Sequence, residues 1–148
     1  MSAHQICLYV EDIESEAFLL RSATTKAGMA IELKTVQDGE EAIRYLNGDG
    51  IYSDRHDYPL PTLMLLDLNL PRKSGFQVLE WLRKQPQLRR MVVIVLTSSH
   101  RQEDVDRAHE LGANAVLIKP TTIEDLVQMI AQLAAWLELT CKPRIDQR

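Results

Sequence analysis

Side chains able to do chemistry stand at the ends of short apolar runs in this chain. They are Glu11 and Asp12 after the first run, Asp67 in the third, Thr97 in the fourth, and Lys119 and Pro120 after the last. Carboxylates gathered in one crevice repel one another, so they either bind a cation or retain protons. Mg²⁺ prefers oxygen ligands and is held by one or two carboxylates, so this set favours a magnesium site.

Asp67 is the candidate nucleophile. A carboxylate beside Mg²⁺ can attack phosphorus and form an acyl phosphate, which is a known form of covalent catalysis by Asp. Lys119 would pair with one oxygen of the phosphoryl group, and the Thr97 hydroxyl would hydrogen-bond another. Each residue alone has a plainer interpretation as a helix cap, a solvated charge or a strand hydroxyl. Their joint placement at separate strand ends favours the chemical interpretation.

The elements that must position these residues are apolar runs that alternate with segments of helical period. The runs are 6–10, 31–36, 63–67, 91–97 and 115–118. Three of them are almost wholly apolar, as strands buried on both faces are, whereas 31–36 is mixed and is expected at an edge. The alternation predicts a parallel sheet covered by helices, with the working groups beyond the carboxyl ends of the strands.

Apolar residues at helical spacing predict which helix faces pack on the sheet. The first of these stripes consists of Phe18, Leu19, Ser22 and Ala23, and the last extends from Leu126 to Leu137. Thr121 and Glu124 are spaced as a capping box at the start of the last helix. The segment 47–62 lacks periodicity and is predicted to be a surface loop, with residues 55–58 solvated.

Length, composition and charge narrow the class of protein. The chain has 148 residues, 45% of them hydrophobic and 26% charged, which predicts one domain without room for a folded output domain. We expect a core of residues 5–138 and a polar tail at 139–148. A net charge of -4 argues against nucleic acid and anionic membranes as partners. The early acidic pair, the lack of a membrane-length apolar run and a content of 2 cysteines predict a cytoplasmic protein.

At these residues the chain resembles the receiver domain of two-component response regulators over nearly its full length. Matches to the family's functional positions are Glu11 and Asp12 for the acidic pair, Asp67 for the phosphoacceptor, Thr97 for the switch hydroxyl, Lys119 for the invariant lysine, and Pro120 for the proline whose preceding bond is usually cis. Asn69 matches the position whose backbone carbonyl binds the metal in the family.

The resemblance implies an α/β fold, the (βα)5 flavodoxin-like three-layer sandwich with a parallel five-stranded sheet in the order 2-1-3-4-5. It implies that Asp67 accepts a phosphoryl group from a histidine kinase. It also implies Mg²⁺ held by Asp12, Asp67 and the Asn69 carbonyl, with Glu11 acting largely through water.

A narrower resemblance is to the stand-alone response regulators paired with cyanobacterial phytochromes. It is carried by the long loop before the third strand and by Leu-Tyr-Val-Glu-Asp, Leu-Asp-Leu-Asn-Leu-Pro-Arg-Lys-Ser-Gly and Val-Leu-Thr-Ser-Ser. It implies a phytochrome histidine kinase as phosphodonor and a tendency to form homodimers. One position departs from the family: receivers commonly carry Tyr or Phe three residues before the lysine, where this chain has Val116. Because Val is stiff and small, we expect dimer rearrangement or loop movement to carry the signal.

The sequence leaves three alternative functions to be considered. A phosphohydrolase of the haloacid-dehalogenase type also forms an aspartyl phosphate, but its second Asp is replaced here by Asn69, which removes the proton donor. A flavodoxin-like nucleotide binder needs a glycine loop where this chain has Glu11 and Asp12. A receiver-fold interaction module that is never phosphorylated is the further alternative. We therefore expect self-catalysed phosphoryl transfer and no turnover of outside substrates.

Histidine and tryptophan side chains have weaker claims to function. We interpret the four histidines, at positions 4, 56, 100 and 109, as ordinary surface residues. Trp81 and Trp136 lie on predicted helices, and Trp136 is the better interface candidate because the last helix extends beyond what the fold requires.

Overall fold

A single parallel sheet with helices on both faces forms the computed structural model, which describes residues 5–28 and 31–140. The strands are β1 (Gln5–Val10), β2 (Ile31–Val36), β3 (Leu63–Leu66), β4 (Val92–Thr97) and β5 (Ala115–Ile118), in the order β2-β1-β3-β4-β5. The helices are α1 (Glu14–Lys26), α2 (Gly39–Asn47), the short 3-10 helix η1 (Gly50–Ser53), α3 (Gly75–Arg83), α4 (Gln102–Glu110) and α5 (Ile123–Leu139). The predicted fold class and strand order are confirmed.

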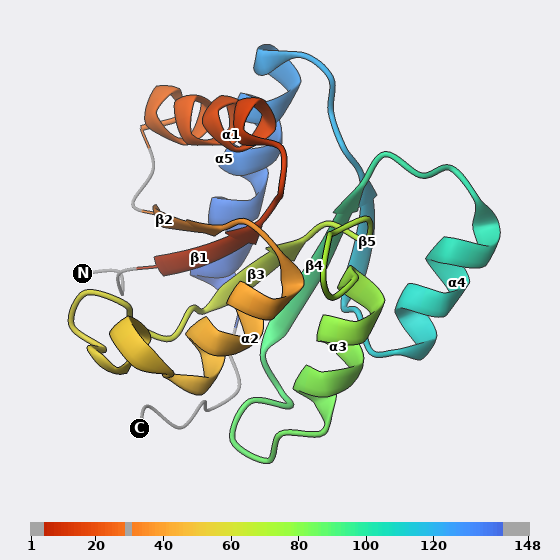
Figure 1. Cartoon of the computed structure of the whole chain (residues 1–148). Helices are drawn as coiled ribbons and strands as arrows, with labels where there is room; N and C mark the ends of the chain where they lie inside the picture. Colours follow the sequence, from red (N-terminus) through yellow and green to blue (C-terminus); the bar gives the residue numbers. More distant parts are fainter. Residues whose placement is uncertain (1–4, 29–30, 141–148) are drawn as a thin grey trace.

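The sheet separates two apolar layers (Figure 1). α1 and α5 cover one face, where Cys7 and Tyr9 of β1 pack, while α2 and α3 cover the other, where Leu8 and Val10 pack. Every residue of β3 and β4 is buried, as expected for central parallel strands. β2 is an edge strand with a half-buried middle, so its predicted edge position is confirmed. In the described ranges, no helix is long and apolar enough to cross a membrane.

α1 packs through a stripe that shares only Ala23 with the predicted one. Ala17, Leu20 and Ala23 are buried, whereas Phe18 and Leu19 are 61% and 41% exposed. Hydrophobicity alone favours the larger side chains, but α1 lies against α5 through a stripe containing two alanines, which lets helices approach closely. The prediction that Phe18 and Leu19 lie in the core is therefore wrong.

The cap of α5 lies one residue later than predicted. The Thr122 hydroxyl, rather than that of Thr121, accepts a hydrogen bond from the Asp125 backbone N–H at 3.2 Å. Two adjacent threonines carry the same capping signal, and both are followed three residues later by an acidic residue. The spacing therefore identifies the helix start without deciding between them.

The segment between α2 and β3 is more ordered than a solvated loop. Its Tyr52 and Tyr58 rings pack with Tyr45 of α2, with centroids 5.1 to 6.0 Å apart. The Arg55 guanidinium donates hydrogen bonds to the carbonyl oxygens of Tyr45 and Leu46 in the last turn of α2. The prediction that residues 55–58 are simply solvated is wrong for Arg55 and Tyr58. His4, Cys141 and the predicted tail beyond residue 140 lie outside the described residues.

Candidate functional site

The carboxyl ends of the strands meet at one edge of the sheet, and backbone hydrogen bonds extend the strand pairing just past the strand ends. The N–H of Glu11 donates to the Val36 carbonyl at 3.0 Å, and that of Lys119 donates to the Thr97 carbonyl at 2.7 Å. The N–H of Asp67 donates to the Val10 carbonyl at 3.3 Å. These bonds position the backbone of the predicted site residues independently of their side-chain contacts.

The Lys119 ammonium occupies the centre of the site. Its Nζ lies 2.6 Å from Glu11 Oε1, 3.0 Å from Glu16 Oε2 and 3.5 Å from Asp67 Oδ2. Glu11 also accepts hydrogen bonds from the Tyr9 hydroxyl at 2.9 Å and the Ile13 N–H at 3.2 Å. Glu16 and Tyr9 are not among the site residues predicted from the sequence. The available signal for Glu16 is its place four residues after Asp12, at the start of a helix that leaves the same sheet edge.

Three carboxylates form a cluster that fits a divalent cation. Glu11, Asp12 and Asp67 each present an oxygen, and these oxygens all lie within 4.8 Å of one another. Asp12 is exposed, while Glu11 and Asp67 are 2% and 5% exposed. An all-oxygen set that is buried on one side and open on the other fits Mg²⁺, which retains several waters. The residues predicted to gather here are brought together.

Charge in the site is unbalanced, with carboxylates outnumbering the ammonium. Burial, reinforced by the negative charge of Glu11 and opposed by Lys119, raises the pKa of Asp67 to about 6. Burial also raises the pKa of Glu11, but the hydrogen bond and charge of Lys119 outweigh it, so the pKa of Glu11 lies below its usual range. For Lys119, burial lowers the pKa, and the bonds to Glu11 and Glu16 more than reverse this effect. At neutral pH Lys119 is therefore an ammonium and Glu11 a carboxylate.

Thr97 connects the sheet edge to α4. Its side chain is fully buried, and its hydroxyl oxygen accepts a hydrogen bond from the Ser99 N–H at 3.1 Å. The Ser99 hydroxyl donates in turn to Asp104 Oδ2 at 2.7 Å, in the first turn of α4. Because the Thr97 hydroxyl is used here as an acceptor, its own proton stays available for donation.

The loop after Asp67 is held in place by close packing. Asp67 Oδ1 accepts a hydrogen bond from the Asn69 N–H at 3.2 Å. A Cβ added at Gly75 would collide with the Asp67 carbonyl, so only glycine fits at the start of α3. Arg72 adopts a left-handed conformation with φ of 67°, and its guanidinium pairs with Asp38 at 3.0 Å.

Two predicted features near the lysine have different outcomes. Val116 is half-buried in β5 and packs on the α2 and α3 side of the sheet, and its role in signalling stays a prediction. The Lys119–Pro120 bond is trans, so the expectation of a cis bond is wrong for this structure. The trans form is the more stable form of X–Pro bonds by about 0.5–1 kcal/mol, and a short motif does not specify departure from it.

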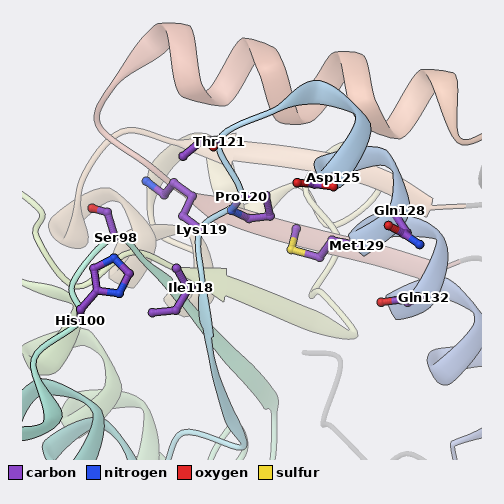
Figure 2. Close-up of a pocket in the computed structure, with 10 residues that line it drawn as sticks. All are labelled: Ser98, His100, Ile118, Lys119, Pro120, Thr121, Asp125, Gln128, Met129 and Gln132. Carbon is purple, nitrogen blue, oxygen red and sulfur yellow. The ribbon is translucent and has the colours of Figure 1, made fainter.

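Two hollows flank Lys119. One of about 520 Å³ opens between the β4–α4 loop, the end of β5 and the first half of α5 (Figure 2). Ser98 and His100 line it from the loop side, and Gln128 and Gln132 line it from α5. The other, of about 210 Å³, is lined by Glu16 and Leu19 of α1 together with Lys119. The lysine is therefore bordered by open space on both sides.

A parallel sheet in this order, with a buried aspartate after β3 facing a lysine after β5, is the arrangement that the resemblance to receiver domains predicts. The chain belongs to the response regulator receiver domain family, whose sequence profile matches residues 7–131. It is 36% identical to the response regulator Rcp1 of Synechocystis sp. over 140 residues, which cover 94% of this chain and 93% of the relative.

Solved structures give the same assignment. The response regulator RPA3017 in red light signalling of R. palustris superposes with a TM-score of 0.88 at 34% identity, covering 94% of this chain and 98% of that chain. The phosphorylated cyanobacterial phytochrome response regulator RcpA superposes with a TM-score of 0.86 at 32% identity, covering 95% and 99%. The Mn²⁺-bound form of Rcp1 superposes with a TM-score of 0.80 at 36% identity, covering 94% of this chain and 99% of that chain. The chain is therefore a receiver-domain response regulator related to phytochrome response regulators.

Proposed function

We propose that this chain accepts a phosphoryl group on Asp67 from the phosphohistidine of a histidine kinase, in a Mg²⁺-dependent reaction, and signals through its own surfaces. The observation that carries the proposal is the convergence on Asp67 of Lys119 and of two further carboxylates within 4.8 Å. No separate enzymatic turnover is part of the proposal, because Asn69 stands where a hydrolase of the haloacid-dehalogenase type places its general acid.

The chemistry requires Asp67 to be ionised and its partner groups to bind the phosphoryl oxygens. An Asp67 carboxylate oxygen forms a bond to phosphorus while the phosphorus–nitrogen bond to the kinase histidine breaks. The leaving imidazole nitrogen keeps that electron pair and takes a proton. Lys119 pairs with one phosphoryl oxygen, and the buried Thr97 hydroxyl donates to another, so charge is balanced from opposite sides.

The metal site of this proposal uses residues that lie together at the sheet edge. Asp12, Asp67 and the Asn69 carbonyl would hold Mg²⁺, with Glu11 acting through water. When bound, the ion supplies positive charge that neutralises the carboxylates and the phosphoryl oxygens. The related Rcp1 has a solved Mn²⁺-bound form, which supports the binding of a divalent cation by this chain.

The partners are proposed from the relatives. Similarity to a cyanobacterial phytochrome response regulator and to a response regulator in red light signalling supports a phytochrome-type histidine kinase as phosphodonor.

We propose that the protein forms a homodimer and is located in the cytoplasm. Mass in solution measured against protein concentration tests the dimer, and a monomer at every concentration, phosphorylated or not, contradicts it.

Acetyl phosphate tests the phosphoacceptor. Wild-type protein incubated with acetyl phosphate and Mg²⁺ is expected to gain the mass of one phosphoryl group, while Asp67→Asn gains none. Absence of a labile phosphorylated species in the wild type refutes the proposal. Steady hydrolysis of small phosphate esters that requires Asp67 would instead indicate a phosphohydrolase.

A further inference from the structure

Lys119 is held by more carboxylates than its proposed reaction requires. Glu16 of α1 supplies the additional one, with its Oε2 3.0 Å from Nζ, which is closer than Asp67 Oδ2 at 3.5 Å. An ammonium has three N–H donors, and here each has a carboxylate acceptor within reach. The N–H that faces Asp67 can pass to a phosphoryl oxygen on the same side chain, and drawing the ammonium toward that oxygen into a short hydrogen bond lengthens its contacts with the two glutamates.

The surroundings of the two glutamates indicate which acceptor yields. The Glu11 side chain is fully buried and is fixed by hydrogen bonds from the Tyr9 hydroxyl and the Ile13 N–H. The Glu16 side chain is 35% exposed. It borders the hollow of about 210 Å³ between α1 and the end of β5, so it has space and solvent to move into. Breaking the contact with Glu16 costs less, because solvent replaces the lost partner.

We propose that Glu16 is a positioning residue that holds Lys119 in the unphosphorylated protein and competes with the phosphoryl group for its ammonium. The proposal rests on the proposed function of Asp67. Through Glu16, the first turn of α1 would directly affect the balance between the unphosphorylated and phosphorylated states. In Figure 2 the Lys119 side chain leaves the end of β5 and points away from Asp125 of α5. The additional carboxylate that it contacts belongs to Glu16 of α1.

A plainer role must be separated from this one. Acidic side chains at the start of a helix stabilise it by interacting with its dipole, and Glu14 and Glu16 both lie in the first turn of α1. Glu14→Gln therefore makes the matched control, since it removes the same charge from the same turn at an exposed position. Glu16→Asp separates contact from charge, because it keeps the charge on a side chain too short to maintain the 3.0 Å contact.

Binding of beryllium fluoride with Mg²⁺, as a stable mimic of the phosphoryl group, provides the test. Glu16→Gln and Glu16→Asp are both expected to bind it about two- to fivefold more tightly than wild type, the range for an ion pair with an exposed partner. Glu14→Gln is expected to match wild type. In ¹⁵N spectra without beryllium fluoride, the Lys119 Nζ signal is expected to shift in both Glu16 variants and to stay unchanged in Glu14→Gln.

Three other results would overturn one of the two proposals. Equal affinities in wild type, Glu16→Gln and Glu14→Gln overturn the role of Glu16 while leaving the phosphoacceptor intact. Tighter binding by Glu16→Gln alone, with Glu16→Asp matching wild type, shows an effect of charge at a distance and also overturns it. A wild type that binds no beryllium fluoride and forms no aspartyl phosphate instead refutes the proposed function itself.

Discussion

Replacing Asp67 with Asn is predicted to stabilise the metal-free protein, although Asp67 is central to the proposed chemistry. Burial is the largest cause that raises the pKa of this carboxyl from 3.8 to about 6. Each pKa unit corresponds to about 1.4 kcal/mol, so an ionised Asp67 lowers the free energy of unfolding by roughly 3 kcal/mol at pH 7.5. Asn keeps an oxygen that accepts the Asn69 N–H. Its NH₂ group, however, faces the Lys119 ammonium, and this unfavourable contact offsets part of the gain in stability. The expected gain is therefore about 1–3 kcal/mol.

The effect of pH on this gain has a defined sign. A carboxyl whose pKa is higher in the folded state than in the unfolded state binds more protons when folded, so it favours folding at low pH. In the wild type this contribution is complete below the unfolded pKa of 3.8 and is lost as the pH rises through about 6. The advantage of Asp67→Asn should therefore be largest above pH 6 and should shrink as the pH falls toward 4.

Urea denaturation with a chelator, repeated across this pH range, measures the difference. Glu14→Gln is the control for removing a surface charge and is expected to change stability by less than about 0.5 kcal/mol. Added Mg²⁺ should raise the stability of wild type and not that of Asp67→Asn, because binding to the folded state alone is stabilising. An Asp67→Asn variant that is less stable than wild type at pH 7.5, or a gap that does not depend on pH, would refute the reasoning.

Three further substitutions test other parts of the fold. Arg83→Lys should cost about 1–3 kcal/mol in urea denaturation, because Arg83 donates to four groups, including the Met91 and Gly112 carbonyls; a neutral result contradicts this. Tyr52→Phe should raise the pKa of Glu41 in a ¹³C NMR titration, since it removes the 2.6 Å hydrogen bond that lowers that pKa; an unchanged pKa contradicts it. Gly75→Ala should cost about 1–3 kcal/mol and weaken Mg²⁺ binding, whereas unchanged values would show that the loop adapts.

The strand ends were predictable from sequence because they depend on local patterns. β3 and β4 are apolar throughout, which specifies strands buried on both faces. A parallel sheet then brings their carboxyl ends to the same edge, so Asp67, Thr97 and Lys119 had to meet there. The same reasoning gives the mixed strand β2 its place at the edge of the sheet.

Features that depend on side-chain size and long-range contact could not be predicted in this way. The contact between Glu16 and Lys119 joins residues 103 positions apart, and no local pattern marks Glu16 as a partner. Phe18 has the spacing of a core residue, but the smaller Ala17 lies in the stripe that packs against α5. Arg55 is polar and lies between turn-forming residues, yet its guanidinium donates to two carbonyls in the last turn of α2. Each outcome was decided by three-dimensional fit rather than by periodicity.

The central claim is that the Asp67 carboxylate itself carries the phosphoryl group. The measurement is made on protein treated with acetyl phosphate and Mg²⁺, then reduced with borohydride, which converts an aspartyl phosphate to homoserine. Tandem mass spectrometry of the resulting peptides identifies the modified position. We predict homoserine at position 67, formed only when Mg²⁺ is present. Homoserine at position 12, a phosphorylated histidine, or no modification in the folded wild type would contradict the account.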